Sequence, residues 1–350
     1  MSEPQSRTPH LTQVDAPAGV ALPTVVLARE VVPAALVAAV RVGELERIRS
    51  GAYRRATPKR TGRATSSAPV AASKLSSSAA ATELALARIA AVGRQLRTPF
   101  WFSHESAALI WGCAVWNPPT RTHLIQTVRP NRHSDPQLAR HLMGLAPADR
   151  TTRRGVPVTS LDRTVADCLT ALPPLDALVI ADSALRLGAD PSAIADRVAA
   201  QAGRRGVAAA RVVLGFADGQ AESPWETFVR YVLLRAGLPR PELQIPVRTR
   251  LGWFRADLGW SEWKLLIEFD GFVKYSTLSG GDPARAVFEE KRRQDAIEEE
   301  GWGVLRVTAA DRRAPESLLQ RVFRRLPSQI VTNLTPIRDL PPVGGSSSSC

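Results

Sequence analysis

The sequence KLLIEFDGFVKY, residues 264–275, places an apolar run directly before two carboxylates, Glu268 and Asp270. Residues two apart on a β-strand point to the same face of the sheet, so these carboxylates would lie close together. Like charges at that distance repel, and a bound metal ion is the usual way to offset the repulsion. A pair of solvated residues at the end of an edge strand is the alternative. The surrounding residues distinguish a metal site from a pair of solvated carboxylates.

The residues on both sides of this stretch predict a compact unit over residues 220–328. Ser223 and Glu226 have the spacing of a capping box, and Pro224 stands at the first helical position, so an amphipathic helix begins there. Strand-like segments and a charged helical segment follow. The predicted order is helix, three strands, helix, strand, helix, over residues 223–237, 242–249, 253–260, 263–271, 282–301, 303–308 and 314–326.

A third carboxylate, Asp257, stands on the strand that precedes the quoted stretch. If residues 259–263 (GWSEW) form the turn between the two strands, Asp257 lies opposite roughly Leu266, one diagonal step from Glu268. In that register Asp257, Glu268 and Asp270 all point to one face. Three carboxylates on one face are the ligands that a hard divalent cation requires. A slip of one residue would move Asp257 to the other face and remove the site.

Four segments in this unit carry a family resemblance: SPWETFVRYVLLRAGLP, RADLGW, LLIEFDG and KRRQDAIEEEGWGVLRVT. In this order and spacing they resemble the PD-(D/E)XK nuclease superfamily, in its branch similar to very-short-patch-repair endonucleases. The resemblance implies a restriction-endonuclease-like αβββαβ core in which Asp257 and Glu268 hold Mg²⁺, with Mn²⁺ as an alternative ion. Asp270 is then a further ligand or orients a water molecule. The ion would activate a water for hydrolysis of a DNA phosphodiester.

Two positions bear on whether such a domain is active. The superfamily carries a lysine two residues after the glutamate, where this chain has Asp270. Lys274 follows shortly afterwards, and is either the charge stabiliser or a solvated loop lysine. Glu226 matches an acid that the family places in its first helix, although the capping box already accounts for this residue. The missing lysine leaves open a catalytically inactive nuclease fold.

The N-terminal part of the chain is strongly basic. Residues 41–63 contain eight basic residues against two acids. A helix followed by a basic hairpin is what a winged helix-turn-helix presents to DNA phosphates, and a solvated hairpin edge is the alternative. Near the C-terminus, Arg292 and Arg293 either face phosphate or form a solvated helix surface with neighbouring acids. The candidates for DNA contact in the hairpin are Arg47, Arg49, Tyr53, Arg54 and Arg55.

The run GELERIRSGAYRR, residues 43–55, resembles the end of the winged-helix unit in AbiEi-type antitoxins of type IV toxin–antitoxin systems. Residues 104–186, with SHESAALIWG and GVPVTSLDRTVADCL, are similar to the domain that follows it there. The resemblance implies a mixed α/β middle domain. It also implies a toxin or another protein as a partner besides DNA.

The middle domain offers no predicted catalytic or metal site. His104 stands beside Glu105 and Ser106, but adjacent residues on a helix do not face one another. Packing and a helix start at Ser103 explain these residues instead. Three other histidines show no spacing typical of metal ligands, namely His123, His133 and His141.

Composition restricts the function classes. The formal net charge is +13 and the pI is about 10.8, which favours polyanions such as nucleic acid, although general arginine usage would give the same balance. The three cysteines form no C-x-x-C pair, so neither a zinc knuckle nor a disulfide framework is indicated. No apolar run approaches the ~18 residues of a membrane span, and the N-terminus lacks a signal pattern. We therefore expect a cytoplasmic protein without a membrane partner.

Composition shifts divide the chain into α/β and α+β units. We expect a DNA-binding protein with a Mg²⁺-dependent endonuclease domain, or alternatively an antitoxin-like repressor whose nuclease fold is inactive. The expected segments are a flexible leader (1–22), a winged helix-turn-helix (23–58), a low-complexity linker (59–82), a mixed α/β AbiEi-like domain (83–215), the nuclease-like domain (220–328) and a disordered tail (335–350).

Overall fold

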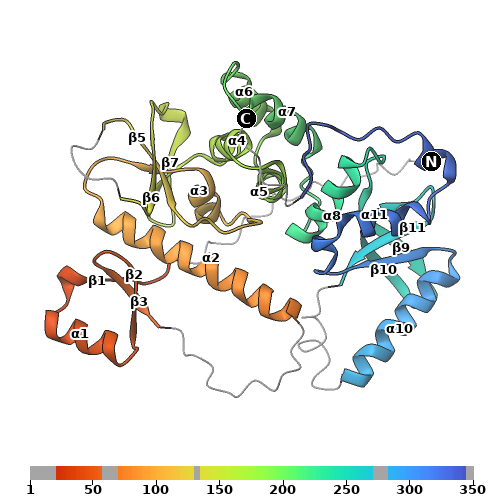
Figure 1. Ribbon diagram of the computed structural model, residues 1–350, viewed down its shortest axis with the longest axis horizontal. Coiled ribbons are helices and arrows are strands. Elements are labelled where there is room, and N and C mark those ends of the chain that lie inside the picture. Colours follow the sequence, from red (N-terminus) through yellow and green to blue (C-terminus); the bar gives the residue numbers. More distant parts are fainter. Residues whose placement is uncertain (1–20, 57–69, 130–134, 271–282, 344–350) are drawn as a thin grey trace, which may run out of the picture.

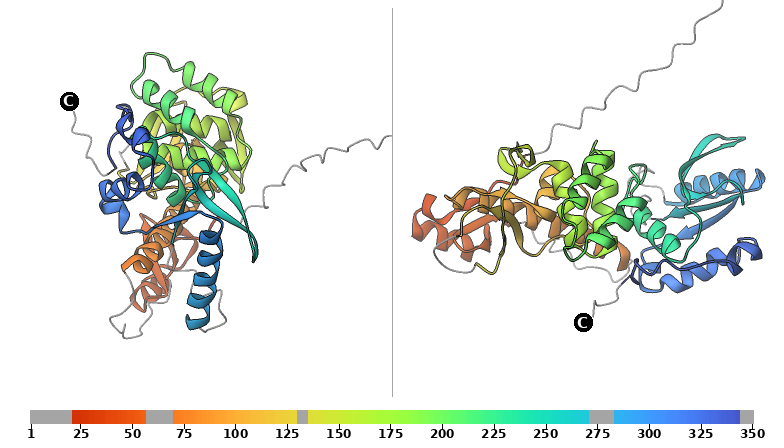
Figure 2. Two further views of the ribbon diagram at one scale, coloured as in Figure 1. Left: turned by 90° about the vertical axis from the view of Figure 1, so that its right-hand side faces the viewer. Right: turned by 90° about the horizontal axis from the view of Figure 1, so that it is seen from above.

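The computed structural model describes residues 21–56, 70–129, 135–270 and 283–343. They form a mixed α/β protein with three separate sheets, and the chain is elongated, with the N-terminal sheet at one end and the C-terminal sheet at the other (Figures 1 and 2). Among the described residues, no helix is both long and apolar enough to cross a membrane.

The N-terminal sheet has three strands in the order β1-β3-β2. As expected, a helix is followed by a tight glycine, Gly43 with φ +78°, and then by a hairpin. A 3₁₀ turn (Ala28–Glu30) precedes that helix. The elements are β1 (Val26–Leu27), α1 (Pro33–Arg41), β2 (Leu45–Arg49) and β3 (Ala52–Arg55).

Helix α2 (Val70–Gln95) joins the N-terminal sheet to the middle of the molecule (Figure 1). Ala87, Ala90 and Ala91 pack against the N-terminal sheet, whereas Ile89 and Val92 pack against the second sheet. The predicted linker was too long, because residues 70–82 are helical. Alanine has the highest helix propensity, and the five alanines among residues 70–82 favour a helix over the linker that the low complexity suggested.

The middle unit combines a five-stranded sheet, in the order β6-β5-β4-β8-β7, with five helices. Ser160 caps α4 by accepting from the amide of Arg163, as its position in the sequence predicts. Strands β5 and β6 run parallel, and β4 runs parallel to β8. The elements are β4 (Trp101–Phe102), α3 (His104–Trp111), β5 (Thr122–Gln126), β6 (Leu138–Leu142), a 3₁₀ turn (Pro147–Asp149), β7 (Arg150–Arg153), β8 (Val156–Thr159), α4 (Leu161–Ala171), α5 (Pro174–Arg186), α6 (Pro191–Ala199) and α7 (Val207–Phe216).

The C-terminal unit follows the predicted order of helix, three strands, helix, strand and helix. Its sheet has the order β12-β11-β10-β9, with β11 and β12 parallel and the other pairs antiparallel. The elements are α8 (Pro224–Arg235), β9 (Glu242–Thr249), β10 (Gly252–Trp260), β11 (Leu265–Phe269), α10 (Pro283–Glu299), β12 (Gly303–Val307), a 3₁₀ turn (Asp311–Arg313), α11 (Pro315–Phe323) and α12 (Ser328–Thr332).

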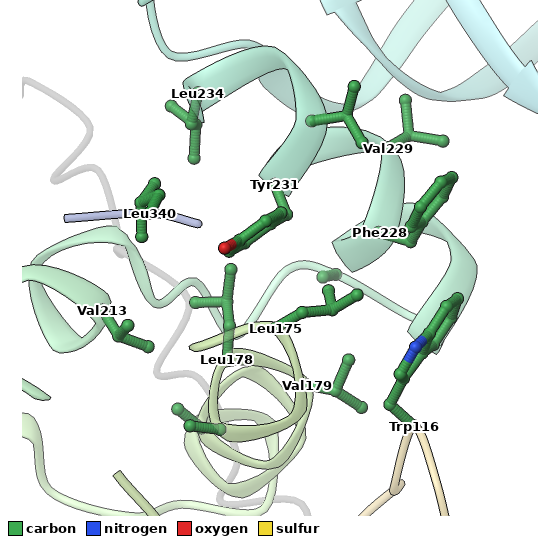
Figure 3. Close-up of a cluster of buried hydrophobic side chains, with 14 of the residues drawn as sticks. Trp116, Leu175, Leu178, Val179, Val213, Phe228, Val229, Tyr231, Leu234 and Leu340 are labelled. Carbon is green, nitrogen blue, oxygen red and sulfur yellow. The ribbon is translucent and has the colours of Figure 1, made fainter. Parts of the chain in front are cut away.

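The middle and C-terminal units share one hydrophobic core. Figure 3 shows Leu178 and Val179 of α5 facing Tyr231 and Phe228 of α8. The rings of Trp116 and Phe228 stack with centroids 5.4 Å apart. The composition therefore changes near residue 216, but this position does not separate two independent cores. The middle and C-terminal units pack against each other.

The predicted disordered tail was wrong for residues 335–343. Leu340 is only 3% exposed and packs in the shared core, and its carbonyl accepts from Arg235 Nε at 3.1 Å. The carbonyl of Pro341 accepts from Tyr231 Oη at 2.7 Å. A few apolar side chains in a proline-rich segment suffice to dock it on α8. Residues 344–350 lie outside the described part of the chain.

Candidate functional site

Acidic and basic side chains lie in one row across the C-terminal sheet. The register of β11 and β12 sets Glu268 opposite Arg306. The register of β10 and β11 pairs Leu258 with Ile267, and one further step sets Asp257 opposite Glu268. Two carboxylates from different strands therefore meet at the centre of this sheet.

The predicted pairing of Asp257 with Leu266 was wrong by two residues. The connection between the strands is a four-residue turn, residues 261–264, so Trp260 pairs with Leu265. Lys264 ends this turn with φ +50°, in the left-handed region. The paired register ends at Leu258 and Ile267, and its continuation by one residue sets Asp257 level with Glu268.

Simple alternation does not set the direction of the Asp257 side chain, because β10 changes face at this residue. Ala256 packs in the cluster on the α10 side of the sheet, whereas Leu258 packs in the cluster on the α8 side. The facing residues of β9 change in the same way around Gln244, which has φ +53°. At this bend Asp257 Oδ2 accepts a hydrogen bond from the amide of Phe269 at 2.8 Å.

Glu268 is buried and forms an ion pair with an arginine of α10. Arg293 Nη2 lies 2.5 Å from Glu268 Oε2, and its guanidinium covers the ring of Phe254. Burial raises the pKa of Glu268, the charge of Arg293 acts in the opposite direction, and the carboxylate of Asp257 raises this pKa further. Arg293, predicted as a DNA contact, is thus half-buried and bound to the predicted metal ligand.

Asp270 belongs to a second ion-pair group beside the first. Its amide donates to the carbonyl of Val307 at 2.8 Å, which continues the pairing of β11 with β12. Its carboxylate lies 3.6 Å from Arg306 Nη1, and Arg306 also pairs with Glu290 of α10. Asp257, Glu268 and Asp270 do not converge into a single three-carboxylate cluster, since the group of metal-ligating side chains that gathers within 4.8 Å in the described residues is a different one.

Glu226 performs the predicted capping role at the start of α8. Ser223 Oγ accepts from the amide of Glu226, and Glu226 Oε2 accepts from the amide of Glu222 and from Gln244 Nε2, both at 2.9 Å. Burial raises the pKa of Glu226, and the charge of Asp257 adds to this rise. Glu226 is thus an electrostatic neighbour of Asp257 from the α8 side. Lys274 lies outside the described residues.

The predicted DNA-binding residues differ in their exposure. Arg47 and Arg55 of the hairpin and Arg292 of α10 are exposed, and Tyr53 is half-buried. The other two hairpin arginines form ion pairs, Arg54 with Glu46 and Glu83, and Arg49 with Asp135.

The prediction of a phosphate contact was wrong for Arg49. Its side chain is 8% exposed and lies 2.5 Å from Asp135 Oδ2. Burial among apolar residues lowers the pKa of Arg49, and the charge of Asp135 opposes this effect. The residue therefore joins the hairpin to the middle unit and does not face solvent.

The sequence analysis missed a histidine cluster in the middle unit. His104, His123 and His141 each offer a ligand atom within 4.8 Å of the others. His104 belongs to α3, His123 to β5 and His141 to β6. The three elements are separate in the sequence, so no short spacing of histidines predicts the cluster. Recognising LARHL, residues 138–142, as a strand parallel to β5 would have been the necessary signal.

Comparisons with known proteins identify relatives without a described function. No family model matches the chain. Two uncharacterized proteins of Mycobacterium tuberculosis, from strains CDC 1551 / Oshkosh and H37Rv, are each 38% identical over 153 residues, which is 43% of this chain and 54% of each relative. The chain thus matches about half the length of these curated relatives. The crystal structure of the RV2827C protein from the same organism covers 55% of this chain and 72% of its own, at 16% identity and a TM-score of 0.31.

Proposed function

We propose that this chain binds DNA and that its C-terminal unit is a nuclease-like domain that hydrolyses DNA phosphodiester bonds with Mg²⁺ or Mn²⁺. The observation that carries the proposal is the proximity of Asp257 to Glu268 at the bend of the C-terminal sheet: the register of β10 and β11, continued by one residue, sets them level, and the charge of Asp257 raises the pKa of Glu268. Both carboxylates belong to the motifs that resemble the PD-(D/E)XK superfamily. The order of elements around them, and the parallel pairing of β11 with β12, support the same proposal.

The residues present fit a hard divalent cation in their donor chemistry. Asp257 raises the pKa of both Glu226 and Glu268, so three carboxylates share one region of negative potential. Oxygen ligands and such a potential are what Mg²⁺ requires. Asp257 and Glu268 would hold the ion, with Asp270 beside them. When bound, the ion supplies an activated water and stabilises charge on the phosphate.

Two arginines take the place of the lysine that the superfamily carries. Arg293 contacts Glu268, and Arg306 stands opposite Glu268 and pairs with Asp270. The planar guanidinium group of an arginine suits the geometry of a phosphate. In this proposal the two arginines orient the carboxylates before DNA binds and then neutralise the scissile phosphate.

DNA would first be held by the N-terminal unit, whose helix and hairpin we interpret as a winged helix. Arg47 and Arg55 are exposed on the two strands of the hairpin and so are available to phosphates. The net charge of +13 favours the same partner.

The ion pair of Glu268 with Arg293 favours a second candidate function. An arginine that neutralises a metal ligand competes with the metal, and such a domain would act as a clamp without cleaving. The chain would then be an antitoxin-like repressor, with DNA and a toxin or another protein as partners.

A cleavage assay separates the two candidates. We expect the purified chain to cut DNA in Mg²⁺ or Mn²⁺, and Asp257→Asn and Glu268→Gln each to reduce the rate at least 100-fold while DNA affinity stays within a few-fold. The matched control is Glu262→Gln, which removes an exposed carboxylate from the turn of the same hairpin and should leave the rate unchanged. DNA binding without cleavage, in the parent and in Arg293→Gln, would reject the nuclease and favour the clamp.

A further inference from the structure

The histidine cluster of the middle unit has an internal geometry that hydrogen bonding alone does not require. His141 Nε2 lies 3.3 Å from His123 Nδ1. Two nitrogens that each lie about 2.0–2.1 Å from one zinc ion are about 3.3–3.4 Å apart at the tetrahedral angle. The observed separation thus equals one edge of a tetrahedral metal site. The same distance is long for a hydrogen bond between nitrogens.

Backbone contacts hold the three rings together. The amide of Ser103 donates to the carbonyl of His123 at 3.1 Å, and the amide of His123 donates to Ser106 Oγ at 2.9 Å, so the start of α3 is fastened to β5. The parallel register pairs Ile125 with His141, which places His123 and His141 on the same face of neighbouring strands. His104 Nδ1 lies 3.0 Å from Ser103 Oγ, which leaves Nε2 of His104 as the atom that can face a ligand.

Burial and neighbouring positive charges act on the three imidazoles. Burial lowers the pKa of His104 well below its ordinary value, that of His123 to about 4, and also that of His141. The charge of Arg163 also lowers the pKa of His104, and Arg163 pairs with Asp149 at 3.2 Å and with Asp167 at 2.8 Å. The charge of Arg121 acts in the same direction on His123 and His141.

A half-buried carboxylate with one buried oxygen lies behind one of the rings. Glu105 Oε2 has no hydrogen-bond partner among the described residues and lies 3.6 Å from His123 Nε2. This nitrogen is on the side of the ring away from His141. A carboxylate behind a ligating imidazole fixes its tautomer and increases its basicity, as in many zinc sites. Without such a role, an acid with a buried and unsatisfied oxygen is difficult to explain.

We propose that His104, His123 and His141 bind a divalent transition-metal ion of the zinc class, with Glu105 as the positioning residue behind His123. Three nitrogen ligands select a borderline-soft ion over Mg²⁺ or Ca²⁺, and they leave one tetrahedral position for water or a further ligand. The rings of His104 and His141 stack with centroids 3.9 Å apart, so one of them turns about χ2 when the ion enters. This site is separate from the carboxylates of the C-terminal sheet and does not depend on the function proposed for them.

Calorimetric titration of the full, chelator-treated chain with ZnCl₂ tests the proposal. We expect one Zn²⁺ per chain, a higher melting temperature on binding, and the same stoichiometry for Co²⁺, whose visible spectrum reports four-coordinate nitrogen ligation. Zn²⁺ affinity should fall at least tenfold in His141→Gln, and about 10- to 100-fold in Glu105→Gln. Two control variants should keep it: Glu262→Gln, which removes an exposed carboxylate from the turn between β10 and β11, and Glu268→Gln, which alters the carboxylate site.

Two results would overturn the proposal. One is the absence of Zn²⁺ binding by the parent chain. This result does not depend on whether a variant folds. The other is binding that persists unchanged in His141→Gln and Glu105→Gln. If Zn²⁺ binding is lost in Glu268→Gln and retained in the cluster variants, the ion belongs to the carboxylates and the histidine site is rejected.

Discussion

Arg230 and Asp182 form an ion pair in the interior where α8 meets α5. Their side chains are 0% and 2% exposed. Asp182 also accepts from Thr227 Oγ1 and from the amide of Asp218, both at 2.8 Å, and Arg230 donates to the carbonyl of Phe216. The sequence does not indicate this network, because a charged residue on an amphipathic helix is ordinarily expected at the surface. Burying a charge pair is costly unless such hydrogen bonds satisfy it.

Removing one partner of this pair should destabilise the protein strongly. In Arg230→Met the carboxylate of Asp182 stays buried without its counter-charge, so we expect the free energy of unfolding to fall by about 3–5 kcal/mol. The double variant Arg230→Met with Asp182→Leu should recover a large part of that loss, since neither charge remains. Urea unfolding followed by circular dichroism measures both. Equal losses in the single and double variants would mean that packing, and not the unpaired charge, sets the cost.

At the scale of helices and strands, local patterns in the sequence predicted most of the C-terminal unit. The capping box at Ser223 and the glycine after α10, Gly301 with φ +80°, mark helix ends by backbone chemistry that any fold must satisfy. The meeting of Asp257 with Glu268 was predicted only approximately. Its exact form depends on the length of a turn and on a bend at Gln244, and neither is encoded in periodicity.

The features that the sequence did not predict depend on contacts between distant segments. The histidine cluster joins α3, β5 and β6, and β6 is a strand of five residues, LARHL, without an alternation of apolar and polar residues. Arg49 was expected at the surface because its neighbours are basic, but Asp135 of the middle unit pairs with it. The docking of Leu340 on α8 is equally long-range. Local propensity carries no information about such partners.

The basic hairpin of β2 and β3 yields a prediction that separates its exposed arginines from its buried one. Arg47 and Arg55 are exposed, so the double variant Arg47→Gln with Arg55→Gln should reduce the slope of log K for DNA against log salt by about 2. Fluorescence anisotropy at several salt concentrations measures the slope. The matched control removes the same charge from the middle unit, in Arg204→Gln with Arg205→Gln, both of which are exposed. An equal change of the slope in both double variants would contradict the hairpin as the DNA contact.

At the scale of the whole molecule, the middle and C-terminal units depend on one another. The shared core contains residues of α4, α5 and α7 from one unit and of α8, β11 and α11 from the other. The network of Arg230 and Asp182 and the docked segment around Leu340 both lie at this junction. Two independently stable domains would not need a common interior. The protein therefore positions its carboxylate site and its histidine cluster on one continuous framework.

A single substitution at the junction should accordingly weaken both units. Leu178 of α5 is 1% exposed and faces α8 (Figure 3), so Leu178→Ala should cost about 2–5 kcal/mol through lost burial and the cavity that it leaves. Hydrogen exchange measured by mass spectrometry should show that β5 and β11 lose protection by the same free energy, because they open together. Ile245→Ala, in the separate cluster on the α10 side, serves as the control for a substitution confined to the C-terminal sheet. If Leu178→Ala lowers the protection of β5 and leaves β11 unchanged, the two units unfold separately and the shared core does not couple them.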